Sequence, residues 1–146
     1  MTDATAAPES IERTLELAAP PARVWKVITD PAELARWFPD RAEWDLRPGG
    51  EGSFFWEGYG TYPIQVVTVE EPRYLAWRWG NQADVGMEAT GATTLVEWWL
   101  DERPGGGTLL RLKESGFTAR KHRDGNEQGW AEELGELREL LEGEVG

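Results

Sequence analysis

The C-terminal segment of this chain carries one apolar stripe that fits a long α-helix. Its apolar residues follow one another at intervals of three or four, the spacing of one helix face: Trp130, Leu134, Leu137 and Leu141. The other positions are rich in glutamate, which predicts a solvated acidic face on a helix that begins between Asp124 and Glu127. A single long amphipathic helix has to bury its stripe against another element of the fold.

The preceding part of the chain consists of short β-branched and aromatic runs separated by turn residues. Strands are predicted over residues 11–17, 42–46, 52–56, 61–69, 74–79, 93–100 and 108–114. Pro63 predicts a sheet edge or a bulge near the start of its run. Between the first two strands, Pro21 begins one short helix, and Asp30 caps a second that starts at Pro31 and ends near Trp37 to Pro39.

This order of elements predicts an α+β fold. Closely spaced strands favour an antiparallel sheet of about seven strands, which twists and curls around the C-terminal helix, with the two short helices after the first strand. Such an arrangement leaves a cavity if the facing side chains do not meet. Residues 1–10 are small and polar and are predicted to form a flexible arm, with residues 11–146 as a single domain.

Composition removes several classes of function. The chain has no Cys and a single His, so thiolate metal sites, cysteine nucleophiles and two-histidine metal sites are excluded, and we expect neither a metal nor another cofactor. A net charge of −12 disfavours nucleic acid and anionic membranes as partners. The N-terminus lacks the pattern of a secretory signal, and no apolar run approaches the ~20 residues of a membrane span. We therefore expect a cytoplasmic protein.

Several short motifs occur in an order that resembles a known family. They are Ala19 to Trp25 (APPARVW), Thr29-Asp30-Pro31 with Trp37-Phe38, Arg47-Pro48-Gly49-Gly50, Gly107-Thr108 leading to Ser115-Gly116-Phe117, and Gly129-Trp130 with Leu134 and Leu137. Over residues 11–142 this set resembles the family named after the activator of heat shock protein 90 ATPase. That family belongs to the START-like superfamily, together with polyketide cyclases and birch-pollen-allergen-type proteins. The resemblance implies a helix-grip fold with an internal hydrophobic cavity. It implies no single function, because relatives include lipid carriers, cyclases, hormone receptors and a co-chaperone domain.

The chain contains nine tryptophans, more than its tyrosines and phenylalanines combined. Alternation along the predicted strands places one set of side chains on the concave face of the sheet, toward the C-terminal helix. With residues of that helix, this set forms the predicted lining of a pocket for a small hydrophobic or aromatic ligand: Phe54, Trp56, Trp77, Trp79, Trp98, Leu112, Glu114, Trp130 and Leu134. The alternative is that the tryptophans simply fill the core.

Glu114 is the polar member of this set. If it is buried, it needs partners and its pKa rises, so that it can orient a ligand or act as an acid or base. The alternative is a solvated carboxylate at the end of a strand. His122 stands among charged residues and is expected in a solvated loop rather than at the mouth of the cavity. Phe55 and Trp99 point outward, where contiguous aromatics would mark an interface.

Three functions follow as hypotheses. The first is binding of a small hydrophobic molecule without evident catalysis. The second is a protein-interaction or co-chaperone-like module, or a homodimer. The third is an enzyme of the cyclase or dehydratase type that uses Glu114.

Overall fold

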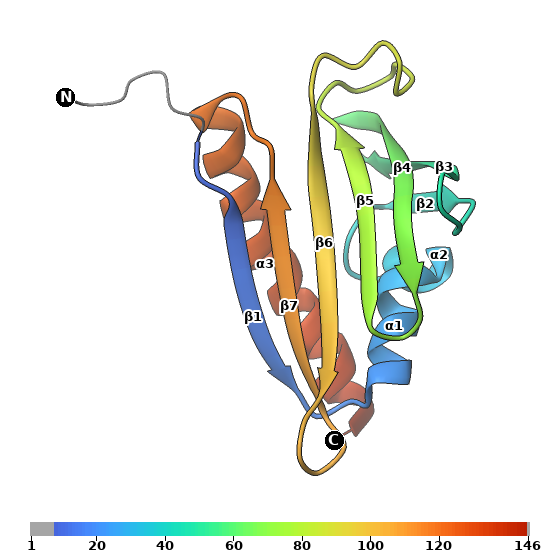
Figure 1. Ribbon diagram of the computed structural model, residues 1–146, viewed down its shortest axis with the longest axis vertical. Helices are drawn as coiled ribbons and strands as arrows, with labels where there is room; N and C mark the ends of the chain where they lie inside the picture. Colours follow the sequence, from blue (N-terminus) through green and yellow to red (C-terminus); the bar gives the residue numbers. More distant parts are fainter. Residues whose placement is uncertain (1–7, 146) are drawn as a thin grey trace, which may run out of the picture.

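The computed structural model of the protein describes residues 8–145 and contains a seven-stranded sheet with three helices (Figure 1). The strands are β1 (Ile11–Leu17), β2 (Arg41–Trp44), β3 (Glu51–Trp56), β4 (Gly60–Glu70), β5 (Tyr74–Gly80), β6 (Thr93–Glu102) and β7 (Thr108–Ser115). The helices are α1 (Pro21–Thr29), α2 (Pro31–Leu34) and α3 (Arg120–Val145). All neighbouring strands are antiparallel, in the order β1-β7-β6-β5-β4-β3-β2.

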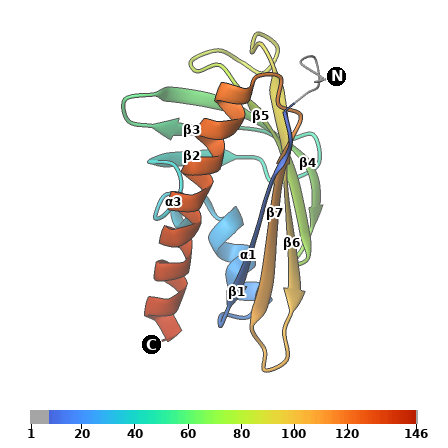
Figure 2. The same cartoon turned by 90° about the vertical axis from the view of Figure 1, so that its left-hand side faces the viewer.

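The predicted helix-grip fold is confirmed. Figure 2 shows α3 running along one face of the curved sheet, with α1 on the same side of the sheet. The side chains predicted to share the concave face of the sheet do share one face, because Trp98 is paired with both Leu112 and Leu75 in the strand register. The apolar stripe of α3 is buried, with Trp130 and Leu134 at most 3% exposed. Helix and sheet therefore share one core.

Helices α3 and α2 and strand β4 differ from the predictions. Helix α3 begins at Arg120 rather than between Asp124 and Glu127, because a charged first turn has no apolar pattern that reveals it. Helix α2 ends at Leu34, and a turn carries the chain through Phe38. Strand β4 is an inner strand, and its irregularity lies between Val66 and Thr68, not near Pro63.

The two short helices meet at Asp30 as predicted. Its side chain accepts a hydrogen bond from the backbone N–H of Ala32 at 3.0 Å and so caps α2. Two indole N–H groups donate hydrogen bonds to backbone carbonyls in the last turn of α1. Trp37 donates to the carbonyl of Val27 at 3.0 Å, and Trp44 donates to the carbonyl of Thr29 at 2.9 Å.

The predicted flexible arm, residues 1–10, lies mostly outside the described residues. Its last two carbonyls, of Glu9 and Ser10, accept hydrogen bonds from Arg123 on α3 at 3.2 and 3.4 Å. None of the helices within residues 8–145 is long and apolar enough to cross a membrane.

We predict that Asp30→Ala lowers the free energy of unfolding by about 1 kcal/mol, because the first turn of α2 loses its cap. Asp101→Ala is the control, since Asp101 is exposed and makes only a 3.5 Å contact with Arg111. Denaturant unfolding measures both variants. Equal stability of the two variants would contradict a capping role for Asp30.

Candidate functional site

The inner tryptophans contact one another in the core between sheet and helix. Phe38, from the turn after α2, lies at the centre of this cluster. Its ring stacks on Trp130 at a centroid distance of 5.0 Å and on Trp37 at 5.1 Å. Trp77 and Trp98 are each 1% exposed, so these two side chains fill the core, as the alternative interpretation predicted.

A pocket of about 430 Å³ remains beside this cluster, partly open to solvent. It lies between the N-terminal half of α3 and the ends of β3, β4 and β5. Six aromatic residues, two acidic residues and a few polar and glycine positions line it: Phe38, Trp56, Tyr59, Tyr62, Trp79, Gly80, Asn81, His122, Gly125, Asn126, Gly129, Trp130, Glu132 and Glu133.

Two glycines of α3 leave room for this pocket. Gly125 and Gly129 are four residues apart and therefore lie on one helix face. A Cβ atom added at either position would meet no heavy atom within 4 Å. Glycine inside a helix is unfavourable by roughly 0.5–1 kcal/mol relative to alanine. The helix thus presents bare backbone to the pocket at a cost in its own stability.

The predicted site residues fall into two groups. Trp56, Trp79 and Trp130 line the pocket. The other predicted residues are fully buried and do not line it: Phe54, Trp77, Trp98, Leu112, Glu114 and Leu134.

The sequence prediction missed several lining residues. Phe38 was assigned to the end of a helix and not to the cavity. His122, Asn126, Gly129 and Glu133 form a second stripe at helical spacing, which the late predicted start of α3 concealed.

Glu114 is 0% exposed, so the alternative of a solvated strand end is wrong. Three side chains donate hydrogen bonds to its carboxylate. The hydroxyl of Thr94 lies at 2.5 Å, the indole N–H of Trp130 at 2.8 Å, and the amide of Asn126 at 3.1 and 3.2 Å from the two oxygens. Burial raises the pKa of Glu114, and the three donors oppose that rise because they favour the charged form.

His122 does not lie in the solvated loop that was predicted. It belongs to the first turn of α3, is half-buried, and its ring packs edge-on against Phe117 at 5.1 Å. Burial lowers its pKa, which favours the neutral imidazole. Its Nε2 lies 3.3 Å from the amide nitrogen of Asn126, so Asn126 connects the pocket wall to the buried Glu114.

Glu133 is the half-buried acid of the pocket. Its Oε2 atom is buried and has no hydrogen-bond partner among the described residues. Burial, together with the nearby acids Glu136, Glu132 and Asp40, raises the pKa of Glu133 to about 7. A hydrogen-bond donor or a cation that enters the pocket would stabilise the charged form of this carboxylate.

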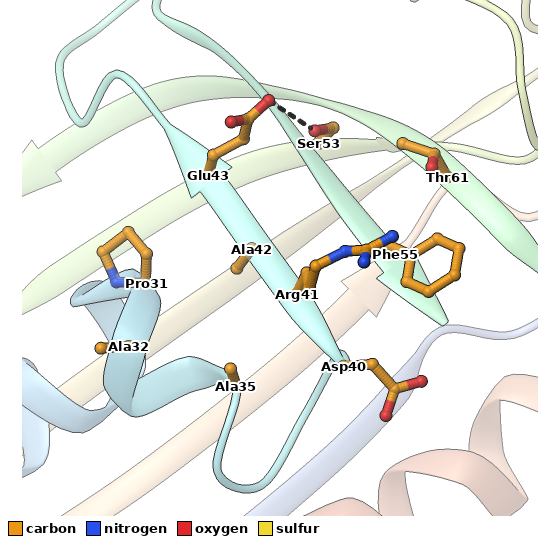
Figure 3. Close-up of a pocket in the computed structure, with 10 residues that line it drawn as sticks. All are labelled: Pro31, Ala32, Ala35, Asp40, Arg41, Ala42, Glu43, Ser53, Phe55 and Thr61. Atoms are coloured by element: carbon orange, nitrogen blue, oxygen red, sulfur yellow. Dashed lines mark hydrogen bonds between the residues drawn. The ribbon is translucent and has the colours of Figure 1, made fainter. Parts of the chain in front are cut away.

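A second hollow, of about 480 Å³, lies next to α2 at the β2–β3 edge of the sheet (Figure 3). Its charged side chains Asp40, Arg41 and Glu43 are all exposed. The guanidinium of Arg41 covers the ring of Phe55 at 4.2 Å, and Glu43 accepts a long hydrogen bond of 3.4 Å from Ser53. Because this hollow presents exposed charges and few aromatic rings, we place the candidate site at the pocket beside α3.

Comparison with known proteins identifies the family. The pattern described as "Activator of Hsp90 ATPase homolog 1-like protein" matches residues 18–142. The chain belongs to this family. A comparison with curated proteins finds no match.

Several solved structures share the fold of this chain. Protein MLL2253 from Mesorhizobium loti is 23% identical with a TM-score of 0.81, over 92% of this chain and 97% of the other. CalU16 from Micromonospora echinospora is 28% identical with a TM-score of 0.74, over 93% and 78%. The Aha1 dimer from Colwellia psychrerythraea is 17% identical with a TM-score of 0.77, over 92% and 96%.

We predict that Glu114→Leu lowers the free energy of unfolding by about 1–3 kcal/mol, because Trp130 and Thr94 lose their acceptor. Glu114→Gln is the matched control, since it keeps one acceptor oxygen and should lose less. Urea unfolding of both variants measures the difference. A leucine variant as stable as the wild type would show that desolvation of the carboxylate outweighs its hydrogen bonds.

The raised pKa of Glu133 predicts a pH dependence of stability. The folded protein keeps this proton to higher pH than the unfolded chain, so the free energy of unfolding falls as pH rises from 4.5 to about 7. Glu133→Gln lacks that fall and should gain about 1 kcal/mol relative to the wild type across this range, allowing for solvent screening. Unfolding at both ends of the range measures the effect, with Glu139→Gln as an exposed control on the same helix. Parallel pH profiles for wild type and Glu133→Gln would contradict the raised pKa.

Proposed function

We propose that this protein binds a small hydrophobic or aromatic molecule in the pocket beside α3, without chemistry of its own. The pocket itself carries the proposal: about 430 Å³ with six aromatic lining residues. Ligand pockets generally measure ~300–1,000 Å³ and combine apolar walls with a few polar groups. Trp56 and Trp79, whose rings stack at 5.5 Å, offer flat apolar surface to such a molecule.

The polar groups of the pocket support a role in orienting the ligand. Asn126 and His122 lie on its wall, and the amide of Asn126 is held by Glu114. A fixed amide adds specificity, because a ligand that cannot match it leaves a polar group unpaired. In this proposal Glu114 is a positioning residue, which acts on the ligand only through Asn126 and Trp130.

An enzyme of the cyclase or dehydratase type is less well supported. Glu114 is fully buried and does not itself line the pocket. Its three donors, Thr94, Asn126 and Trp130, carry groups that do not ionise near neutral pH. An acid or base has to come within hydrogen-bond reach of the substrate proton that it moves. The position of Glu114 therefore favours a structural and orienting role.

A homodimer or protein-interaction module is the second candidate. The Aha1 protein from Colwellia psychrerythraea is described as a dimer, although its 17% identity bears on the fold alone. The outward aromatics Phe55 and Trp99 lie on β3 and β6, which are not neighbours, and each is covered by an arginine. The two rings are therefore separate and partly covered, and binding within the pocket stays the first proposal. A cytoplasmic location also remains a prediction.

Blocking the pocket tests the proposal directly. Gly129→Leu points a side chain into the pocket from the helix backbone, where there is free space. Gly135→Leu is the matched control, because Gly135 lies on the same helix with equal free space but does not line the pocket. Both substitutions favour the helix, so neither should destabilise the protein.

The probe is N-phenyl-1-naphthylamine, a neutral aromatic dye whose fluorescence rises in apolar surroundings. We expect wild type and Gly135→Leu to bind it equally and Gly129→Leu to bind it about tenfold more weakly or not at all, because the leucine occupies the ligand volume. Equal titration curves for all three proteins would overturn the proposed pocket.

A further inference from the structure

We propose that the natural ligand is a cation, a small molecule with an aromatic or apolar body and a protonated or quaternary amine. Its positive charge would lie against the carboxylate of Glu133 and the aromatic faces of Trp56 and Trp79. This inference rests on the proposed function, because it names the chemical class of the molecule that the pocket holds.

The charges around the pocket have one sign. Glu132 and Glu133 line it, and Asp40 lies near enough to act on Glu133. Among the described residues that line the pocket, none is Lys or Arg. The remaining basic side chain, His122, favours its neutral form because it is half-buried. An anionic ligand would meet uncompensated repulsion here, whereas a cation would be attracted.

Glu133 also lacks a partner that a cation would supply. Its buried Oε2 atom accepts no hydrogen bond from the described residues. The charged groups that act most strongly on it are Glu132, Glu136 and Asp40, all of the same sign. A carboxylate oxygen shielded from water and left without a donor is unfavourable. A ligand ammonium group beside Glu133 would neutralise it and remove that penalty.

The aromatic walls suit the same kind of molecule. The ring faces of Trp and Tyr attract cations, and quaternary ammonium groups are recognised by several such rings together. Trp56, Trp79 and Trp130 supply indoles to the pocket, and Tyr59, which is 75% exposed, joins them at its mouth. Aromatic walls alone would accept any apolar molecule. The combination with an unpartnered acid selects one that carries a positive charge.

Three probes with one aromatic body and different charges test the inference: benzyltrimethylammonium, its neutral isostere neopentylbenzene, and the anion phenylmethanesulfonate. Tryptophan fluorescence reports binding, since three indoles line the pocket. We expect the cation to bind about tenfold more tightly than the neutral isostere, and the anion to bind most weakly.

Variants of α3 assign the effect to one carboxylate. Glu133→Gln keeps the shape of the side chain and should weaken binding of the cation about tenfold relative to binding of the neutral isostere. Glu139→Gln is the control, because Glu139 is exposed on the same helix and does not line the pocket. Thermal unfolding of each variant verifies that it is folded.

The outcomes separate the inference from the proposed function. If the neutral isostere binds as tightly as the cation, or if Glu133→Gln leaves their affinity ratio unchanged, the cation inference is overturned and the pocket stands. If neither ion binds at millimolar concentration and the neutral isostere does not bind up to its solubility limit, the proposed function fails and the inference fails with it.

Discussion

The buried carboxylate of Glu114 is the interaction on which the arrangement of sheet and helix depends. It stands at the end of β7 and accepts hydrogen bonds from Thr94 on β6 and from Asn126 and Trp130 on α3. Because these donors converge on one residue, the carboxylate fixes how α3 is rotated against the sheet. That rotation turns the indole of Trp130 into the core and leaves the backbone at Gly129 facing the pocket.

The pocket is what remains after the tryptophans have packed. Phe38 and the large indoles around it pack in the core between the sheet and α3. Gly125 and Gly129, in the N-terminal half of α3, have no side chains that would occupy the space beside this cluster. The same helix that closes the core thus keeps one part of it open. Stability and ligand access are divided along α3, with the leucines in its C-terminal half and the two pocket-lining glycines, Gly125 and Gly129, in its N-terminal half.

Much of this could be read from the sequence because its physical signals are local. Period-two alternation placed Trp98, Leu112 and Glu114 on the concave face, and the leucine stripe revealed α3. Alternation could not decide whether Glu114 was buried, because that depends on Thr94 and Asn126, which belong to other elements, β6 and α3. Trp56, Trp79 and Trp130 were predicted to line a pocket, but the rest of its lining escaped prediction because the open space depends on missing side chains. Glycines in a helix leave no apolar pattern, and only the position of the neighbouring strands shows what space they open.

A crystal structure of the wild-type protein with benzyltrimethylammonium would test the central claim, that the pocket beside α3 is the binding site. The account predicts density for the probe between Trp56, Trp79 and the backbone of Gly129, with its ammonium group beside Glu133. Density in the hollow near Arg41 and Glu43, with the pocket beside α3 empty, would contradict it.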